Sequence, residues 1–200
     1  MQACHIIATD LACRRGDRQL FSGVTMDLRG GQAVQVVGQN GIGKSSLIRI
    51  IAGLLRPAAG KVSREGAIGL VNEQSALDPA LPLGLALAFW RRIDGAGDDA
   101  IARLGLADLL DVPVRYLSTG QVKRAVMARL MGQGAAVWLL DEPLNGLDAE
   151  ASVLVQTLTA EHCAEGGIAV IASHQGFVLD GMAQLDLATF SPSSSAEGLI

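Results

Sequence analysis

The chain has 200 residues, of which 50% are hydrophobic and 18% are charged, so it suits one domain with a sizeable core better than two domains. Its formal net charge is −4 and only 4% of its residues are aromatic, so it lacks the clustered positive charge and the stacking side chains of typical nucleic-acid-binding proteins. Its three cysteines are odd in number and widely spaced, which argues against a disulfide framework or a zinc site.

The first part of the chain alternates β-like runs with turns. The runs CHIIATDLAC and QLFSGVTMDL flank the polar turn RRGDR and predict an antiparallel hairpin or meander within residues 3–28. The run QAVQVVG predicts a strand, and a glycine-rich loop leads from it into KSSLIRIIAGLL. That segment predicts a helix, because apolar residues recur at helical spacing at Leu47, Ile50, Ile51 and Leu54. The segment GKVSREGAIGLVNE then predicts two further short strands.

The remainder of the chain predicts helices between buried strands. Residues 83–131 have a helical pattern with polar breaks near 93–98 and 111–118. The run AVWLLD predicts a buried strand, and DAEASVLVQTLTAEHCAEGG predicts a helix that begins near Asp148 and ends before Gly166. GIAVIAS predicts another buried strand and LDLATF a last edge strand, whereas residues 191–200 have the composition of a flexible tail.

Alternating strands and helices predict an α/β fold in which a mostly parallel sheet is covered by helices on both faces. The N-terminal hairpin adds an antiparallel β part to this sheet protein. The helical block at about 83–131 predicts an inserted α-helical subdomain. We therefore expect residues 1–200 to form a single domain.

The loop GQNGIGKSS matches the phosphate-binding pattern G-x-x-x-x-G-K-[ST], with a predicted strand before it and a predicted helix after it. In this pattern backbone N–H groups wrap the β-phosphate of a nucleotide, Lys44 bridges the β- and γ-phosphates, and the hydroxyl of Ser45 ligates Mg²⁺. A glycine-rich turn beside a helix cap is the alternative, but one of only three lysines falls where a compact ammonium is needed. The expected nucleotide-binding residues are Gly38, Gln39, Asn40, Gly41, Ile42, Gly43, Lys44, Ser45 and Ser46.

The segment AVWLLDEP places Asp141 and Glu142 directly after a predicted buried strand. In open parallel sheets the chemistry gathers at the carboxyl ends of the strands. We expect Asp141 to hold Mg²⁺ through water and Glu142 to polarise an attacking water. A solvated turn at the end of a core strand is the alternative, and the phosphate loop favours the functional interpretation.

A second candidate phosphate site is LSTGQ, residues 117–121, which precedes a basic and apolar helical run. Ser118 or Thr119 can cap that helix, and Gly120 permits a close approach of the backbone. The N-terminus of a helix attracts anions through its free N–H groups and its dipole. One small domain therefore contains two predicted phosphate-binding helix starts.

The motifs GQNGIGKSS, LSTGQ and LLDEP, in this order, resemble those of ABC-type ATPases, which have the RecA-like P-loop NTPase fold. NGLD at 145–148 resembles the D-loop of that family, and the resemblance covers residues 2–190. It implies a head-to-tail homodimer in which ATP on the P-loop of one molecule is closed over by LSTGQ of the other. Ser118, Gly120 and Gln121 would then contact the nucleotide in trans, and hydrolysis would let the dimer open.

The same resemblance implies individual roles. Glu142 would be the catalytic carboxylate, and His174, which follows IAVIAS, would hold the γ-phosphate and the catalytic water beside Lys44. Gln74, in VNEQSALD, matches the glutamine that reaches Mg²⁺ and faces the membrane partner. The implied metal ligands are Ser45, Gln74 and Asp141. His5 and His162 are interpreted instead as surface or core histidines.

One part of the sequence departs from the family pattern. ABC-type ATPases usually stack the adenine on an aromatic side chain upstream of the P-loop, where ACRRGDRQLF has Arg14 or Arg15. A guanidinium can also stack on a base. The residue that contacts the base is therefore left open.

The chain has no membrane span, no signal peptide pattern, no second ATPase copy and no coiled-coil insertion. The stretch at 14–57, the small helical block, the dipeptide HQ at 174–175 and the short C-terminus resemble those of the ATP-binding subunits of the cytochrome c maturation and haem export systems. This implies integral-membrane partner subunits, a peripheral location on the cytoplasmic face of the inner membrane, no nucleic acid, and haem handled by the partners.

Three alternatives to that assignment stay open. The chain could be the ATPase of another ABC importer or exporter, a soluble ABC ATPase that acts on nucleic acid, or a regulator that binds nucleotide without hydrolysis. The apolar run LPLGLALAFW at 81–90 has two interpretations of its own, a docking face for a helix of a membrane partner and a core helix.

Overall fold

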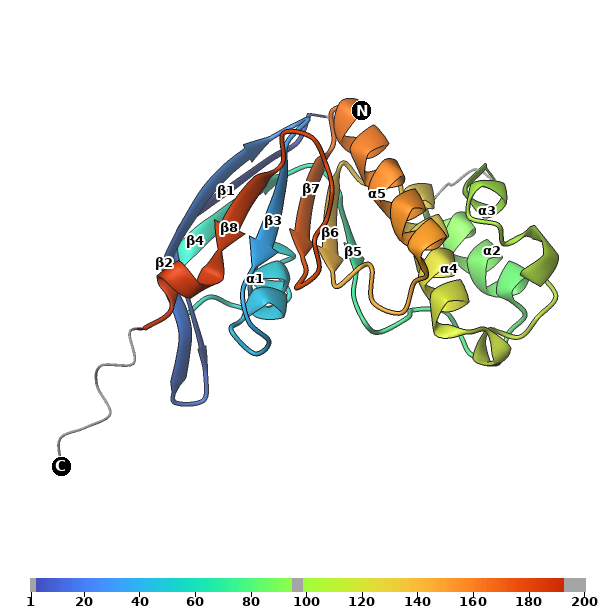
Figure 1. Ribbon diagram of the computed structural model, residues 1–200, viewed down its shortest axis with the longest axis horizontal. Helices are drawn as coiled ribbons and strands as arrows, with labels where there is room; N and C mark the ends of the chain where they lie inside the picture. The colour runs from blue at the N-terminus through green and yellow to red at the C-terminus, as the bar shows by residue number, and fades with distance from the viewer. Residues whose placement is uncertain (1–2, 95–98, 193–200) are drawn as a thin grey trace.

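The computed structural model describes residues 3–94 and 99–192, which form two β-sheets and a group of helices (Figure 1). Among these residues, the larger sheet has five parallel strands in the spatial order β5-β6-β7-β3-β8. Its strands are β3 (Ala33–Val37), β5 (Ile68–Val71), β6 (Val137–Asp141), β7 (Ile168–Ala172) and β8 (Ala183–Asp186). The predicted α/β fold with a mostly parallel sheet is therefore confirmed.

The smaller sheet is antiparallel and has the order β2-β1-β4 within the same described ranges. Its strands are β1 (His5–Arg15), β2 (Arg18–Arg29) and β4 (Ala59–Glu65). The first two form the predicted hairpin, with Arg15 paired to Arg18 beside the turn. The two strands predicted in GKVSREGAIGLVNE both form, but they join different sheets, because β4 pairs with β1 whereas β5 pairs with β6.

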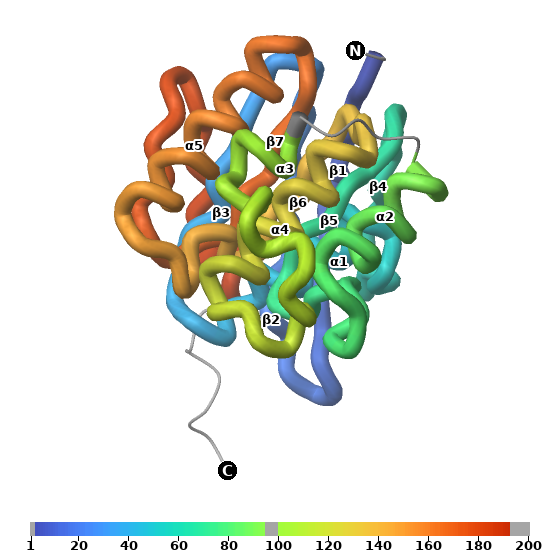
Figure 2. Tube along the Cα trace, turned by 90° about the vertical axis from the view of Figure 1, so that its right-hand side faces the viewer, coloured from blue at the N-terminus to red at the C-terminus, as the bar shows by residue number. Residues whose placement is uncertain are grey.

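Helices cover both faces of the parallel sheet, and each face has its own core. Helix α1 (Lys44–Ile51) packs between the two sheets, and α2 (Leu83–Asp94), α3 (Asp99–Arg103), α4 (Thr119–Gly132) and α5 (Ala149–Ala164) belong to the opposite side (Figure 1). In Figure 2 the helices α2, α3 and α4 lie nearest the reader, in front of the strands. Strand β6 serves both cores: Val137 and Leu139 face α1, and Trp138 and Leu140 face the other helices.

Helix α1 ends earlier than its hydrophobic spacing predicts. Leu47, Ile50 and Ile51 are fully buried as expected, but Leu54 lies beyond the helix and is 68% exposed. The cause is Gly53, whose φ of 79° places it in the left-handed region and ends the helix. The N–H of Gly53 donates to Ile50 and that of Leu54 to Arg49, which is the hydrogen-bond pattern of a Schellman motif.

The end of the described chain also differs from the expectation. The segment LDLATF was expected to be an edge strand, but β8 ends at Asp186 and is followed by the 3₁₀ helix η3 (Leu187–Phe190). The carboxylate of Asp186 accepts a hydrogen bond from the N–H of Ala188 and so caps this short helix. The expected flexible tail lies largely outside the described residues, which end at 192.

The segment between α3 and α4 contains two short 3₁₀ helices, η1 (Ala107–Leu109) and η2 (Val114–Tyr116). The second lies within the polar break predicted at 111–118, and the first lies before it. Most of the other predicted break, 93–98, lies outside the described residues. Helix α2 buries Leu83 and Leu87 in the core but leaves Leu85 and Phe89 exposed. No helix within the described ranges is long and apolar enough to cross a bilayer.

All three cysteines are free thiols inside the two cores. Cys4 and Cys13 belong to the core around α1, and Cys163 belongs to the core on the opposite face. Burial raises the pKa of all three thiols, and for Cys163 it raises the pKa to about 11. These cysteines are therefore packing residues that stay protonated at neutral pH.

Candidate nucleotide-binding site

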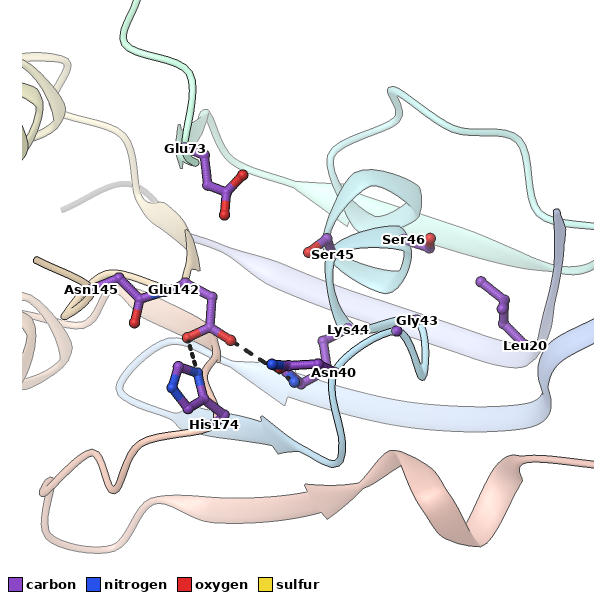
Figure 3. A pocket seen from close by; sticks show the side chains of 11 residues that line it. Leu20, Asn40, Gly43, Lys44, Ser45, Ser46, Glu73, Glu142, Asn145 and His174 are labelled. Atoms are coloured by element: carbon purple, nitrogen blue, oxygen red, sulfur yellow. Dashed lines mark hydrogen bonds and ion pairs between the residues drawn. The ribbon is translucent and has the colours of Figure 1, made fainter.

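A cavity of about 340 Å³ opens beside the N-terminus of α1, at the carboxyl ends of β6 and β7 (Figure 3). Parallel strands bring their carboxyl ends to one edge of the sheet, so loops distant in sequence meet there. The cavity is lined by Leu20, Asn40, Gly41, Gly43, Lys44, Ser45, Ser46, Glu73, Glu142, Asn145 and His174. The two predicted elements of the site, the phosphate loop and the Asp-Glu pair, thus meet in one place.

The phosphate loop leads into the first turn of α1, which lies beside this cavity and has no side-chain cap. Gly43 is the N-cap residue with a φ of 117°, and it makes no capping hydrogen bond through a side chain. A Cβ at this position would lie 3.1 Å from the ring of Phe21, so both the backbone conformation and the packing require glycine. The first N–H groups of α1 therefore face the cavity unpaired by any cap, as an anion-binding helix start requires.

Lys44 is buried in this site, with only 6% of its surface exposed. Its ammonium donates hydrogen bonds to the carbonyl oxygens of Gly38 at 2.8 Å and Gln39 at 3.4 Å. The same nitrogen lies 3.9 Å from Oε1 of Glu142. A buried positive charge is thus held by the loop at the cavity wall, where an anionic ligand can reach it.

Asp141 and Ser45 form the second polar pair of the site. Ser45 Oγ donates to Asp141 Oδ1 over 3.0 Å, and Asp141 is only 5% exposed. Burial raises the pKa of Asp141, and the hydrogen bond from Ser45 acts in the opposite direction. A buried carboxylate beside a hydroxyl is a hard oxygen donor set that suits a divalent cation such as Mg²⁺, whose charge would offset the cost of burial.

Glu142 and His174 are in contact at the wall of the cavity. Oε2 of Glu142 lies 2.8 Å from Nδ1 of His174, as the dashed line in Figure 3 shows. The backbone of Glu142 has a φ of 49°, in the left-handed region that is unfavourable for residues other than glycine. Its N–H donates to the carbonyl of Ala172, which continues the pairing of β6 with β7 by one residue. This conformation turns the carboxylate out of the sheet and toward Lys44 and His174.

Several predicted residues lie beside the cavity instead of lining it. Gln74 is exposed, and its backbone N–H donates to Oδ1 of Asn72, whereas its neighbour Glu73 lines the cavity. Gly38 and Gln39 contribute carbonyl oxygens to Lys44. Sequence reasoning did not assign Leu20, Glu73 or Asn145 to the site. Asn145 lies in the NGLD motif and could have been included, but nothing in the sequence marks Leu20, which approaches because the N-terminal hairpin folds over the loop.

The LSTGQ residues do not line the cavity of their own chain. Ser118 caps α4 by accepting a hydrogen bond from the N–H of Gln121, and the side chain of Gln121 accepts one from the N–H of Ser118. This reciprocal capping box fixes the start of α4. A Cβ on Gly120 would lie 3.1 Å from the carbonyl of Gly146, so the start of α4 packs against the NGLD loop.

Comparisons with known proteins show the family to which this chain is similar. A family model described as ABC transporter matches residues 21–145. The cytochrome c biogenesis ATP-binding export protein CcmA of Novosphingobium aromaticivorans is 58% identical over 96% of this chain and 100% of its own length. The CcmA of Zymomonas mobilis is 45% identical over 96% of this chain and 86% of its own length.

Solved structures show the same fold. An ABC transporter ATP-binding protein from Pyrococcus furiosus superposes with a TM-score of 0.82 and is 23% identical over 94% of this chain and 100% of that chain. The cbiO1 protein of Clostridium perfringens, part of the transporter complex cbiONQ, has a TM-score of 0.70 and 25% identity over 85% of this chain and 78% of that chain.

Proposed function

This chain belongs to the ABC transporter family, among its cytochrome c biogenesis ATP-binding export proteins (CcmA), and we propose which of its residues bind and hydrolyse ATP. It is the ATP-hydrolysing subunit of an ABC transporter that serves cytochrome c biogenesis and haem export. The observation that carries the residue assignment is the contact between Glu142 and His174, 2.8 Å apart, opposite the ammonium of Lys44. We propose that residues 1–200 form a single ATP-binding domain with a helical subdomain at about 83–131.

ATP binds with its phosphates on the phosphate loop. The uncapped N–H groups of α1 contact the β-phosphate, and Lys44 exchanges its contacts with Gly38 and Gln39 for the β- and γ-phosphate oxygens. Gln39, Asn40, Gly41, Ile42, Gly43 and Ser46 complete the cradle. Leu20 lies at the wall of the cavity, where it offers an apolar surface, whereas the ring of the neighbouring Phe21 is fully buried.

Ser45 and Asp141 would hold a Mg²⁺ ion, and Gln74, which is exposed in the loop after β5, would be its third protein ligand. When bound, Mg²⁺ neutralises negative charge on the β- and γ-phosphates. The fit rests on the buried hydroxyl–carboxylate pair with its 3.0 Å contact. Because burial raises the pKa of Asp141, a cation beside it would favour the ionised form of this carboxylate.

Glu142 accepts the proton from the water that attacks the γ-phosphorus in line with the leaving ADP oxygen. The bond from water oxygen to phosphorus forms as the bond to the bridging oxygen breaks, and the proton passes through Glu142 to the released phosphate. His174 orients the carboxylate through its 2.8 Å contact and holds the γ-phosphate with its other ring nitrogen. Lys44 stabilises the charge that develops on the transferred phosphoryl group.

A second copy of the chain supplies Ser118, Gly120 and Gln121 to the γ-phosphate. The hydroxyl of Ser118 accepts its capping bond, so its own proton is free to be donated to a phosphate. The pair works at the cytoplasmic face of the inner membrane with integral-membrane subunits. Closure of the pair on ATP and its opening after hydrolysis move those subunits, which handle the haem.

Replacement of Glu142 by glutamine tests this assignment. Glu142→Gln removes the proton acceptor but keeps the shape of the side chain, so we expect turnover to fall by about 10²–10⁴-fold while the Kd for ATP changes by less than about threefold. Phosphate release and ATP binding are measured on the same preparation. Glu65→Gln, on the exposed strand β4, is the matched control and should behave as the wild type. Turnover of Glu142→Gln within a few-fold of the wild type would refute the role of Glu142.

A further inference from the structure

A buried lysine outside the phosphate-binding loop contacts the backbone of the catalytic carboxylate. Lys123, on the second turn of α4, is only 8% exposed. Its ammonium donates a 2.9 Å hydrogen bond to the backbone carbonyl oxygen of Glu142. A buried ammonium is costly unless it is paired, so the position of Lys123 calls for a compensating role.

The contact falls on the part of Glu142 whose conformation is unusual. Glu142 has a φ of 49°, and its backbone leaves the sheet immediately after its N–H has donated to Ala172. In this left-handed conformation the carbonyl points toward α4, where Lys123 donates to it and the N–H of Asn145 approaches it at 3.4 Å. Lys123 therefore stabilises the conformation that presents the carboxylate to His174.

Lys123 lines a second cavity, which shares two lining residues with the nucleotide cavity. A cavity of about 250 Å³ lies between α4, the loop at 72–75 and the NGLD loop, and it is lined by Lys123, Glu73 and Asn145. Glu73 and Asn145 also line the nucleotide cavity. Burial lowers the pKa of Lys123, and the negative charges of Glu73, Asp141 and Glu142 raise it, so three carboxylates favour the charged ammonium.

We propose that Lys123 is a positioning residue that holds the backbone of Glu142 in its hydrolysis-competent conformation and ties it to α4. This inference rests on the proposed function of Glu142 and of the LSTGQ segment. Helix α4 begins at the LSTGQ segment, whose Ser118 faces the nucleotide bound to the second copy. A shift of α4 when that nucleotide is enclosed moves Lys123, and with it the carbonyl of Glu142. The contact thus joins closure of one nucleotide site to hydrolysis at the other.

Substitution of the ammonium tests the proposal in the full chain. Lys123→Met keeps the length of the aliphatic stem and removes the donor, so we expect turnover to fall at least about tenfold while the Kd for ATP stays within about twofold. Lys123→Arg retains a donor and should recover a substantial part of the lost turnover. Lys61→Met removes an exposed lysine of β4 and is the matched control, with turnover equal to the wild type. Thermal melting of each variant confirms that it is folded.

A double substitution separates positioning from a general structural effect. If Lys123 acts through Glu142, adding Lys123→Met to Glu142→Gln leaves the residual hydrolysis unchanged, because the group that Lys123 positions has already been removed. An equal loss in both backgrounds would overturn the proposal. Turnover of Lys123→Met within twofold of the wild type would also overturn it.

Hydrogen exchange gives a readout that does not depend on hydrolysis. In Lys123→Met we expect the amides of Glu142 and of residues 144–147 to exchange faster, while those of β7 keep their wild-type rates. Unchanged exchange at 142–147 would overturn the proposal even if the wild type hydrolyses ATP as expected. If the wild-type protein does not hydrolyse ATP, but Lys123→Met still exchanges faster at 142–147, the contact is supported. Only the proposed function is then refuted.

Discussion

One buried histidine, His162, lies outside the nucleotide cavity and belongs to packing and not to ATP chemistry. His162 was interpreted as a surface or core histidine, and it is buried on α5, where its ring stacks on Trp138 with the centroids 4.0 Å apart and the planes 9° apart. Nε2 lies 3.3 Å from the carbonyl of Ile168. A Cβ at Gly167 would collide with the ring, so a glycine at this position makes room for the histidine.

The buried state of His162 predicts a pH dependence of stability. Burial lowers the pKa of His162 in the folded protein, so the unfolded chain binds the proton more readily below the ordinary value of about 6.5. The neutral ring contributes its full stability above that pH, and stability is lost as the pH falls below it toward the lower folded pKa. We expect urea unfolding from pH 7.5 to 5.5 to show a larger loss of free energy for the wild type than for His162→Gln. Equal losses in the two proteins would contradict the assignment.

The site residues that could be predicted from the sequence are those whose side chains have a chemical role within a short motif. Lys44, Ser45, Asp141, Glu142 and His174 come from short motifs, and the structure brings all five to one cavity or its wall. Leu20 and Glu73 were missed, because their approach depends on how a hairpin and a loop fold around the site. The backbone of Glu142 was also unpredictable, since nothing in LLDEP specifies a left-handed residue.

At the scale of elements, Trp90 of α2 contacts both α4 and the loop after β5. The guanidinium of Arg129 lies 3.5 Å from the centroid of the Trp90 ring, and the indole N–H of Trp90 donates to the carbonyl of Ala76 over 3.0 Å. Ala76 follows Gln74 in the loop after β5. Two helices and this loop are therefore fixed by one tryptophan.

Removal of the indole N–H tests the strength of this connection. Trp90→Phe keeps an aromatic ring under Arg129 but loses the hydrogen bond to Ala76, so we expect the free energy of unfolding to fall by about 1 kcal/mol. Urea denaturation at pH 7.5 measures the change. Tyr116→Phe removes a hydroxyl from an exposed ring and should change stability by less than about 0.5 kcal/mol. Equal stability of wild type and Trp90→Phe would show that the bond contributes nothing.

The elements themselves were largely predictable, and their ends and partners were not. Alternating and apolar runs located the strands from β1 to β7, and Asp148 caps α5 as its position suggested. The end of α1 at Gly53 and the change from β8 to η3 at Asp186 depend on local caps that a hydrophobic pattern does not contain. The separation of β4 from β5 depends on which distant strand each one meets, and no local signal specifies that choice.

At the scale of the whole molecule, the phosphate loop and LSTGQ occupy different parts of the chain's surface. The loop lies at α1, between the two sheets, whereas LSTGQ begins α4 on the opposite side of the parallel sheet (Figure 1). Among the described residues, the cavity beside the phosphate loop has no lining residue from LSTGQ. This separation supports the proposed pairing of two copies, each of which completes the site of the other.

Ser118→Arg tests that pairing. The bulky cation would occupy the space of the γ-phosphate in the partner's site, so we expect no ATP-dependent dimer while the monomer binds ATP with an unchanged Kd. Size-exclusion chromatography with and without ATP, in the Glu142→Gln background that slows hydrolysis, measures the dimer. Ser63→Arg, on the exposed face of β4, is the control and should dimerise as its parent does. A normal dimer of Ser118→Arg would refute contact in trans.

The burial of Cys4, Cys13 and Cys163 has a practical consequence for measuring motion in this protein. Thiolates react with maleimides and thiols do not, and these three groups are both shielded and held protonated. A dye or spin label offered to the folded chain will therefore attach to a cysteine engineered on the surface, such as one replacing Leu54, without removal of the native ones. Distances between labels on two copies can thus be measured by spectroscopy in an otherwise unaltered protein.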